Sequence, residues 1–278
     1  IKTSGYRAKH LNNICLKFEA INNDGSSCKF NPMDMVRLGT QHEVKDAGNL
    51  AVMLIDTDGK GFAGDHWRTS AVDLLTGVIL HILYTKKNKN LNSVTRFISG
   101  IDPDTDNAYG GDKNWLGEMM GETGISHLEA YSLYKHISRE QAKKELGDLI
   151  DEMGVNKVVK TSASKLYFKD GKAEGERSSI ISSTNAPLSI YNDPIIALNT
   201  STSSFKLTDF QAHKQAISLY VVVAPTDQER LNPLIRILIT QIINTVQATE
   251  LGKNRELLFL LDEFAKLKRM DVVEAAMA

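Results

Sequence analysis

The sequence predicts an α/β fold in which a parallel sheet is interrupted by an inserted helical domain. Two apolar runs, 218–224 and 257–261, have the length and composition of buried strands, and a helical pattern separates them. Strand, helix and strand in this order give a right-handed crossover between parallel strands. Between residues 65 and 198 helical patterns dominate, which indicates a helical layer placed within the α/β domain.

The two ends of the chain carry the elements of the sheet. Residues 13–18 predict a first strand, and apolar positions between 43 and 55 predict a helix with one buried face. After the strand at 218–224, a helix is expected to begin near Thr226 or Asp227. Pro233 falls within this helix, where it would either kink the helix or mark its first turn.

The middle of the chain predicts a series of helices. The strongest pattern runs from Trp67 to Leu83, and shorter helices are expected at 91–101, 115–120, 126–137, 138–153 and 178–191. His127 and His136 lack the spacing of metal ligands, so we expect them at the surface or at the edge of the core. We therefore expect three segments along the chain, 1–64, 65–198 and 199–278.

Composition narrows the class of protein without identifying it. The chain has 278 residues, 42% of them hydrophobic, and a net charge of -1, so contact with nucleic acid or anionic lipid would depend on local patches. Cys15 and Cys28 form neither a disulfide framework nor a metal site. No apolar run reaches the roughly 18 residues typical of a membrane span. Because the chain begins at Ile1 and ends within an apparent helix, we expect a fragment of a longer protein.

Asp262 and Glu263 are the candidate site residues. They follow an apolar run directly, so they are expected at the carboxyl edge of a parallel sheet, where ligands bind. In the Walker B strand of nucleoside triphosphatases the first acid holds Mg²⁺ and a second acid polarises the attacking water. The alternative is an ordinary core strand whose solvated end is acidic.

Two glycine-containing patterns at 56–67 do not support a ligand site. Asp56-Thr-Asp-Gly59 is similar to a calcium loop, but Trp67 stands where a bidentate Glu is required. Gly59-Lys60-Gly61 is not a phosphate cradle either, because the P-loop spacing Gly-x4-Gly-Lys-Ser/Thr occurs nowhere in the chain.

With these features in view, the chain resembles the VirD4/TraG family of coupling-protein ATPases of conjugation and type IV secretion. The resemblance covers nearly the whole length, and its individual motifs are weak while their order is specific. The motifs are Thr3-Ser-Gly-Tyr-Arg7, Phe30-Asn-Pro-Met33, Asp65-His-Trp67, Glu176-Arg-Ser-Ser-Ile180, Asp193-Pro194, Asn199-Thr-Ser201, Ser218-Leu-Tyr-Val-Val-Val-Ala-Pro225, Arg230-x-x-Pro-Leu234 and Leu260-Leu-Asp-Glu-Phe264.

The resemblance implies a RecA-like P-loop NTPase domain, built from 1–64 and 199–278, with an inserted all-α domain at 65–198. It also implies a homo-hexamer that uses ATP and Mg²⁺, with Asp262 as the metal ligand and Glu263 as the catalytic residue. A membrane anchor and Walker A would precede Ile1, so the chain alone is expected to be inactive. Arg177, Arg230 and Gln241 match family positions without an assigned role; pairing of Arg230 with Glu229 or Glu250, and hydration of Gln241 on the helix surface, would explain two of them.

Three functions remain open from the sequence. The first is part of a coupling protein that delivers relaxase-bound single-stranded DNA to a type IV secretion channel, with the parent at the bacterial inner membrane and this region in the cytoplasm. The second is a coupling ATPase for secreted protein substrates only, in which the helical domain selects effectors. The third is a non-catalytic docking module for other secretion components.

Overall fold

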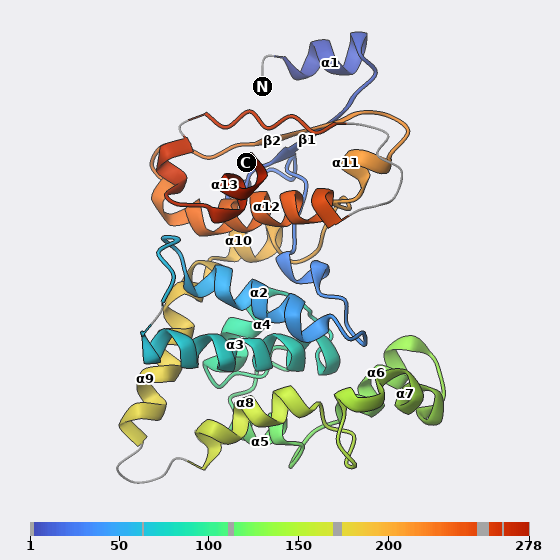
Figure 1. The fold of residues 1–278 in the computed structure, drawn as a ribbon, viewed down its shortest axis with the longest axis vertical. Helices are drawn as coiled ribbons and strands as arrows, with labels where there is room; N and C mark the ends of the chain where they lie inside the picture. Colours follow the sequence, from blue (N-terminus) through green and yellow to red (C-terminus); the bar gives the residue numbers. More distant parts are fainter. Residues whose placement is uncertain are drawn as a thin grey trace. The chain divides into compact units, whose positions relative to one another are not determined.

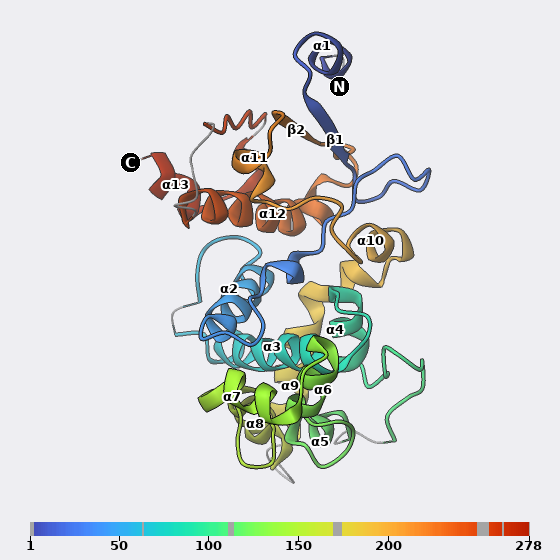
Figure 2. The ribbon, with the colours of Figure 1, turned by 90° about the vertical axis from the view of Figure 1, so that its right-hand side faces the viewer.

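The computed structural model describes residues 3–62, 64–110, 114–168, 174–248, 256–262 and 264–277. Contacts within the chain define two compact units, whose elements are labelled in Figures 1 and 2. We call residues 1–32, 56–61 and 193–278 the sheet unit, and residues 33–55 and 62–192 the helical unit. The protein is therefore a mixed α/β protein that is mostly helical.

The sheet unit contains a two-stranded parallel sheet. β1 (Ile14–Phe18) pairs with β2 (Ile217–Val221), and Ile14 lies opposite Ile217. Both strands were expected from their apolar pattern, and parallel pairing is confirmed. The helices of this unit are α1 (Ser4–His10), α10 (Pro194–Asn199), α11 (Asp209–Ala212), α12 (Gln228–Ala248) and α13 (Asp271–Met277), with the 3₁₀ helix η5 (Phe264–Leu267).

α12 is the long helix of the sheet unit, and its predicted position is confirmed. It begins at Gln228 and keeps a broad apolar face buried, so Pro233 lies inside the helix and does not mark its first turn. Proline cannot donate the backbone hydrogen bond of that turn. The helix continues through this position because the apolar residues that follow, including Leu234 and Leu238, are fully buried.

The expected strand at 257–261 is corrected by the structure. These residues run extended near β2 in Figures 1 and 2, but they form no strand in the described part of the chain. Leu258 is 76% exposed and Leu260 is 78% exposed, whereas Leu257, Phe259 and Leu261 are partly covered. A buried parallel strand needs ladder partners and covered faces, and the described residues provide this segment with cover on one face only.

The helical unit is built around α3 (His66–Thr85), whose residues from Leu74 to Tyr84 are buried. Asp65 begins the helix by accepting the backbone N–H of Arg68. The other elements of this unit are η1 (Pro32–Met35, in which Pro32 belongs to the sheet unit), α2 (Glu43–Ile55), α4 (Leu91–Ile98), α5 (Asn114–Met120), α6 (His127–Lys135), α7 (Arg139–Leu146), η2 (Gly147–Leu149), α8 (Lys157–Tyr167), α9 (Glu174–Asn185) and η4 (Ala186–Asn192).

Three elements of the helical unit differ from the sequence-based expectation. α2 was expected with residues 1–64, but 33–55 group with the helical unit, because the apolar face of α2 packs on α3. α7 is shorter than 138–153, since Gly147 with a φ of 48° ends it. α8 was not predicted: its polar Ser, Thr and Lys residues hide the buried positions Val159, Ala163 and Leu166.

A buried carboxylate joins three helices of this unit. Glu43 of α2 has no exposed surface, and its oxygens accept hydrogen bonds from the Gly39 N–H, the Tyr84 hydroxyl and the Asn156 amide, each at 2.7 Å. Asn156 also begins α8, because its side-chain oxygen accepts the N–H groups of Val158 and Val159. Burial raises the pKa of Glu43, while these three donors act in the opposite direction.

The same network continues through two buried histidines with a fixed proton arrangement. The backbone N–H of Asn156 donates to Nδ1 of His127 at 3.0 Å, so the neutral ring of His127 carries its proton on Nε2. That proton is donated to Nδ1 of His81 at 3.0 Å. His81 therefore carries its own proton on Nε2, which lies 3.3 Å from Oε1 of Glu118. Protonation of either ring would place two N–H groups against each other.

The far end of the network is an ion pair. Lys86 lies 2.8 Å from Glu118 and donates to the Tyr109 hydroxyl at 3.1 Å, and Tyr109 in turn donates to Glu118. Burial alone would raise the pKa of Glu118, but its hydrogen bonds from His81, Lys86 and Tyr109 lower it to about 2. Burial lowers the pKa of both His81 and His127.

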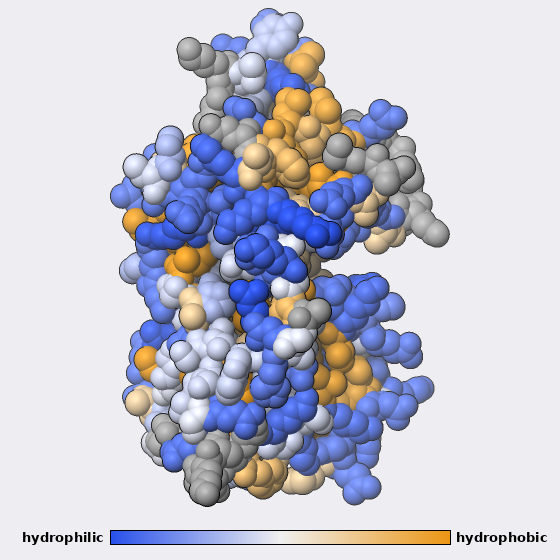
Figure 3. All heavy atoms as spheres, turned by 60° about the vertical axis from the view of Figure 1, so that its left-hand side comes forward, coloured by the Kyte–Doolittle hydropathy of each residue, from blue (hydrophilic) through white to orange (hydrophobic). Residues whose placement is uncertain are grey.

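On the face drawn in Figure 3 polar residues predominate, and apolar residues gather in a few areas, the most visible of them in the upper part and at the lower right. Among the helices of the described residues, none combines the length and the apolar content that crossing a bilayer requires.

The histidine pair predicts that stability decreases in mild acid. Between the ordinary histidine pKa near 6.5 and the lower pKa of the folded state, the unfolded chain binds more protons than the folded chain. The free energy of unfolding should therefore fall as the pH drops below about 6.5, by at most about 2.7 kcal/mol per pH unit for two histidines. Denaturant unfolding followed by tryptophan fluorescence measures this unit, because Trp67 and Trp115 both belong to it.

His81→Gln should lower stability at pH 7.5 and make its pH dependence shallower. His42→Gln, at an exposed position of the same unit, should leave the profile unchanged. The raised pKa of Glu43 has the opposite effect, because the folded chain then binds a proton on Glu43 at a pH where the unfolded chain does not. If the free energy of unfolding of the wild type rises toward pH 5.5, Glu43 outweighs the histidine pair.

Candidate functional site

The predicted site lies at the end of the extended segment 257–261. Asp262 is exposed in a turn directly after this segment. Glu263 lies outside the described residues, so its predicted role is not tested. Immediately beyond them, η5 starts at Phe264, and the backbone from 266 to 269 is held by α12.

Three polar side chains along one face of α12 contact this segment, and two of them hold its backbone. Gln228, Asn232 and Arg236 are spaced four residues apart, so they lie on the same side of the helix. The Lys266 ammonium donates to Oε1 of Gln228 at 3.1 Å, and Nδ2 of Asn232 donates to the Lys266 carbonyl at 2.9 Å. Nη1 of Arg236 donates to the carbonyls of Leu267 and Arg269, the latter at 2.7 Å. We call this arrangement the α12 clamp.

The loop 56–61 packs against the clamped backbone. Gly59 has a φ of 70°, and a Cβ added there would lie 2.1 Å from the Arg269 carbonyl oxygen and 2.8 Å from Nη2 of Arg236. Glycine is therefore required for both conformation and close approach. Burial lowers the pKa of Arg236, and the nearby carboxylates of Asp56 and Asp58 oppose this effect.

Two backbone N–H groups of the turn Gly59-Lys60-Gly61 are already bonded to a carboxylate of the chain itself. Asp56 accepts the backbone N–H of Lys60 at 3.2 Å and that of Gly61 at 3.0 Å. A phosphate would need these same N–H groups. The structure therefore agrees with the expectation that this turn is not a phosphate cradle.

The polar residues at family-matching positions contact the protein itself. Arg230 forms an ion pair with Asp193, which caps α10 by accepting the N–H groups of Ile195 and Ile196. Thus Arg230 does not pair with Glu229, one of the partners considered from sequence; Glu250 lies outside the described residues. Gln241 is buried, not hydrated at the surface, and donates to the Pro32 carbonyl at 3.0 Å.

Two further polar side chains at family-matching positions are buried. Arg177 is 5% exposed and lies 3.7 Å from Glu174. Nδ2 of Asn199 donates to the carbonyls of Ala20 and Asn22 at 3.0 and 2.8 Å. Of these four residues, Gln241 and Asn199 hold backbone carbonyls, whereas Arg230 and Arg177 lie beside side-chain carboxylates.

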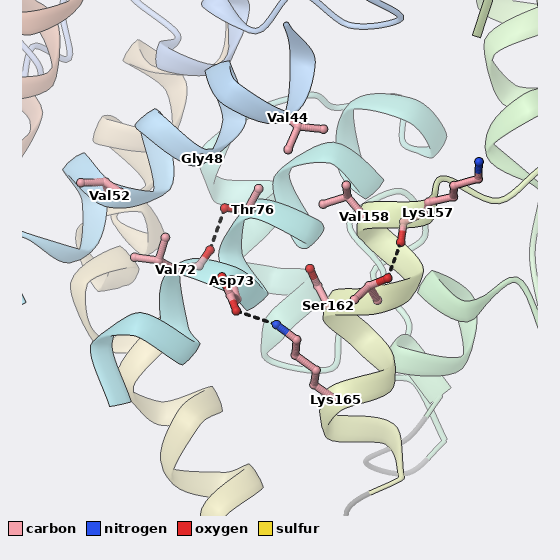
Figure 4. A pocket seen from close by; sticks show the side chains of 11 residues that line it. Val44, Gly48, Val52, Val72, Asp73, Thr76, Lys157, Val158, Ser162 and Lys165 are labelled. Atoms are coloured by element: carbon pink, nitrogen blue, oxygen red, sulfur yellow. Dashed lines mark hydrogen bonds and ion pairs between the residues drawn. The ribbon is translucent and has the colours of Figure 1, made fainter. Parts of the chain in front are cut away.

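A hollow of about 460 Å³ opens on the helical unit between α2, α3 and α8. Figure 4 shows valines on its walls and the Asp73–Lys165 ion pair, 2.7 Å long, on its rim. Gly48 borders the hollow, and a larger residue would have space there, because an added Cβ would meet only Thr76 Oγ1 at 3.9 Å. The lining combines apolar groups with the hydroxyls of Thr76 and Thr161, which donate to the backbone carbonyls of Val72 and Lys157.

Asp262 is the predicted Mg²⁺ ligand, and it lies among the described residues. Asp262 is an exposed carboxylate, and Mg²⁺ typically takes one or two protein carboxylates together with substrate phosphates. No group of three His, Cys, Asp or Glu side chains suited to a metal occurs among the described residues. The role of Asp262 as a metal ligand therefore stays a prediction.

Sequence reasoning missed Asn232 and Arg236 as site-supporting residues. Their signal was present: polar residues at 228, 232 and 236 recur every four positions along an otherwise strongly apolar helix. Such a polar row is also typical of a solvated helix face, so its partner could not be identified before the backbone of 266–269 was placed beside it.

The comparisons with known proteins cover the whole chain. A family model described as "Type IV secretory system Conjugative DNA transfer" matches residues 1–278. "Conjugal transfer protein TraG" of Escherichia coli is 31% identical over 99% of this chain and 39% of its own length. "Protein VirD4" of Rhizobium radiobacter is 27% identical over 94% of this chain and 32% of its own length. The chain therefore spans about two fifths of the length of this TraG relative.

The α12 clamp predicts protection of 266–269 from trypsin, which cleaves after Lys266, Lys268 and Arg269. Loss of one hydrogen bond of about 1 kcal/mol raises local opening about fivefold, and bonds from a charged donor contribute more. Asn232→Ala should therefore speed cleavage at these sites about fivefold, and Arg236→Ala about tenfold or more, because cleavage follows the open population. Timed digestion with mass spectrometry gives the rates.

Arg230→Gln is the matched control for the clamp. It removes an arginine from the same helix that pairs with Asp193 and not with 266–269. Cleavage at 266–269 should stay at the wild-type rate. Equal rates in Arg236→Ala and wild type would contradict the clamp.

The occupied turn at 59–61 predicts weak nucleotide binding by the isolated chain. The chain has no P-loop motif, and the amides of Lys60 and Gly61 are bonded to Asp56, so a polyphosphate near Asp262 would lack those donors. Binding of Mg-ATP should be no tighter than about millimolar, as expected for a few unsupported contacts. Calorimetric titration measures the dissociation constant for Mg-ATP. A saturable site with micromolar affinity would show that the chain does contain a phosphate cradle.

Proposed function

Because the chain belongs to the type IV secretory system conjugative DNA transfer family, we propose that it is part of an ATP-driven coupling protein. The protein delivers relaxase-bound single-stranded DNA to a type IV secretion channel. The observation that carries the proposal is the family match over residues 1–278, supported by relatives named for conjugal transfer. The chain spans 39% of such a relative, so the activity belongs to the complete protein.

The proposed nucleotide site uses the carboxyl edge of a RecA-like sheet. Parallel β1 and β2, the helix α12 and the extended segment ending at Asp262 are consistent with that architecture. ATP bound with Mg²⁺ supplies the transferable phosphoryl group and the charge that neutralises its oxygens. Asp262 would be one metal ligand, and Glu263 would orient the lytic water.

The α12 clamp supports this assignment by fixing the chain just beyond the two acids. Arg236 and Asn232 hold backbone carbonyls between Lys266 and Arg269. A carboxylate that orients water must be placed within a few tenths of an ångström, and packing of the adjacent backbone provides that placement. In this proposal the clamp positions Asp262 and Glu263 without contacting substrate.

The proposed assembly extends beyond this chain. The complete protein would act as a homo-hexamer at the bacterial inner membrane, with this region in the cytoplasm. Its partners would be the relaxase–DNA complex and other components of the secretion system. The net charge of -1 gives no general attraction for DNA, so DNA contact would be confined to local positive patches.

The proposal predicts separable effects for the two acids in the complete protein. Glu263→Gln should still bind ATP but hydrolyse it about a hundredfold more slowly, a typical loss for a positioned base. Asp262→Ala should weaken binding of Mg²⁺-nucleotide itself. Steady-state hydrolysis, nucleotide titration and mating-based DNA transfer measure the three consequences.

Glu256→Gln provides the matched control, since this exposed carboxylate stands at the opposite end of the same apolar segment. It should hydrolyse ATP and transfer DNA at wild-type rates. Wild-type turnover in Glu263→Gln would remove Glu263 from the mechanism. Unchanged DNA transfer in both acid variants would contradict an ATP-driven role.

A further inference from the structure

The end of α6 carries an exposed aromatic ring beside two lysines. Tyr134 is 58% exposed and its neighbour Leu133 is 62% exposed, although both follow the buried Tyr131 in the same helix. The loop after α3 brings Lys89 to this ring, with Nζ 3.8 Å from the ring centroid. Nζ of Lys135 lies 5.9 Å from the same centroid. We call Lys89, Tyr134 and Lys135 the α6 cluster.

The α6 cluster holds two like charges together. Burial, and then the charge of Lys135, lower the pKa of Lys89. Lys135 forms no ion pair within the described part of the chain, and it also lies 5.7 Å from the centroid of Tyr131. Interaction with a ring face stabilises an ammonium by about 0.5–1 kcal/mol at an exposed site. An anion placed between the two ammonium groups would remove their repulsion.

The surroundings of the cluster carry several cations. α6 and α7 together contain four, Lys135, Arg139, Lys143 and Lys144, against three carboxylates, Glu129, Glu140 and Glu145, while the whole chain carries a net charge of -1. All four cations are exposed. α7, which carries three of them, packs directly on α6. The area is therefore a local patch of the kind that contact with a polyanion requires.

An unusual backbone conformation keeps this patch at the surface. His136 ends α6 with a φ of 54°, a conformation that glycine adopts more readily. It turns the chain into α7 while Ile137 packs on the core formed by Tyr84, Leu128 and Tyr131. The ring of Tyr134 thus projects from a rigid helix end anchored by buried neighbours.

We propose that the α6 cluster binds single-stranded nucleic acid, with a base stacked on Tyr134 and a backbone phosphate between Lys89 and Lys135. Stacking on exposed aromatic rings combined with cations that follow the backbone is the general mode of such binding. An acidic peptide would use the lysines alone and would leave the exposed ring and Leu133 unexplained. The proposal rests on the DNA-transfer function proposed above and assigns a contact to it.

Fluorescence anisotropy of the 278-residue chain with a labelled oligothymidylate tests the site across a salt series. Wild type should bind saturably, and its affinity should fall with salt. Tyr134→Ala should weaken binding about fivefold or more at every salt concentration, because stacking of one base is uncharged. Lys89→Gln and Lys135→Gln should each reduce the slope of log affinity against log salt by about 0.7, the value for one lost phosphate contact on a single strand.

Conservative and matched controls separate the site from general damage. Tyr134→Phe retains the ring and should bind as wild type. Tyr6→Ala removes an exposed tyrosine of α1 that stacks on His10, and Lys157→Gln removes an exposed lysine of α8; both should retain wild-type affinity and salt slope. Unchanged circular dichroism shows that the variants fold.

Two results would overturn the inference. One is wild-type affinity in Tyr134→Ala and Lys89→Gln; the other is a chain that binds polyglutamate but no oligothymidylate, which would indicate a protein ligand instead. Mating-based transfer by the complete protein distinguishes the two proposals. If wild type and Tyr134→Ala both transfer DNA normally, only the nucleic-acid site at the α6 cluster is refuted. Absence of transfer by wild type removes the proposed function, whatever the oligonucleotide data show.

Discussion

The helical unit depends on one carboxylate that has no contact with solvent. The Glu43 carboxyl group is tolerated in the core only because donors from the loop before α2, from α3 and from the start of α8 surround it. Each donor belongs to a different part of the chain, so satisfying Glu43 fixes how the three helices meet. The histidine pair then extends this polar arrangement toward Glu118. Packing of valines and leucines alone would accept several helix arrangements, whereas this network accepts one.

Sequence periodicity predicted the elements that bury a continuous apolar face. The positions of β1, β2, α2, α3 and α12 followed from spacing of apolar residues, because a strand or helix with one covered face repeats that face along the chain. A parallel sheet was also expected, but the order of strand, helix and strand pointed to 218–224 and 257–261, whereas the observed parallel pair is β1 and β2. Asp262 was expected at the end of a buried strand, and it follows a segment that is extended but forms no strand among the described residues. The predicted strands and helices share a local cause that is present within each stretch of sequence.

Features decided by distant partners could not be predicted. His81 lies within an apolar helix, and only the folded chain shows that His127 and Glu118 complete its hydrogen bonds. α8 is polar on most of its surface and was missed for that reason. The strand expected at 257–261 was wrong. Five consecutive apolar residues favour burial, but the sequence does not show whether other segments pack on both of their faces. The clamp residues of α12 were ambiguous until their carbonyl partners were known.

The close approach of Gly59 to Arg269 has a mechanical consequence. The loop 56–61 belongs to the sheet unit, but the chain enters it from α2 and leaves it toward α3, both in the helical unit. Since no side chain separates Gly59 from the Arg269 carbonyl, a residue with a Cβ at this position would push the loop away from the backbone that the α12 clamp holds. The spacing between these two segments of the sheet unit is therefore set by glycine.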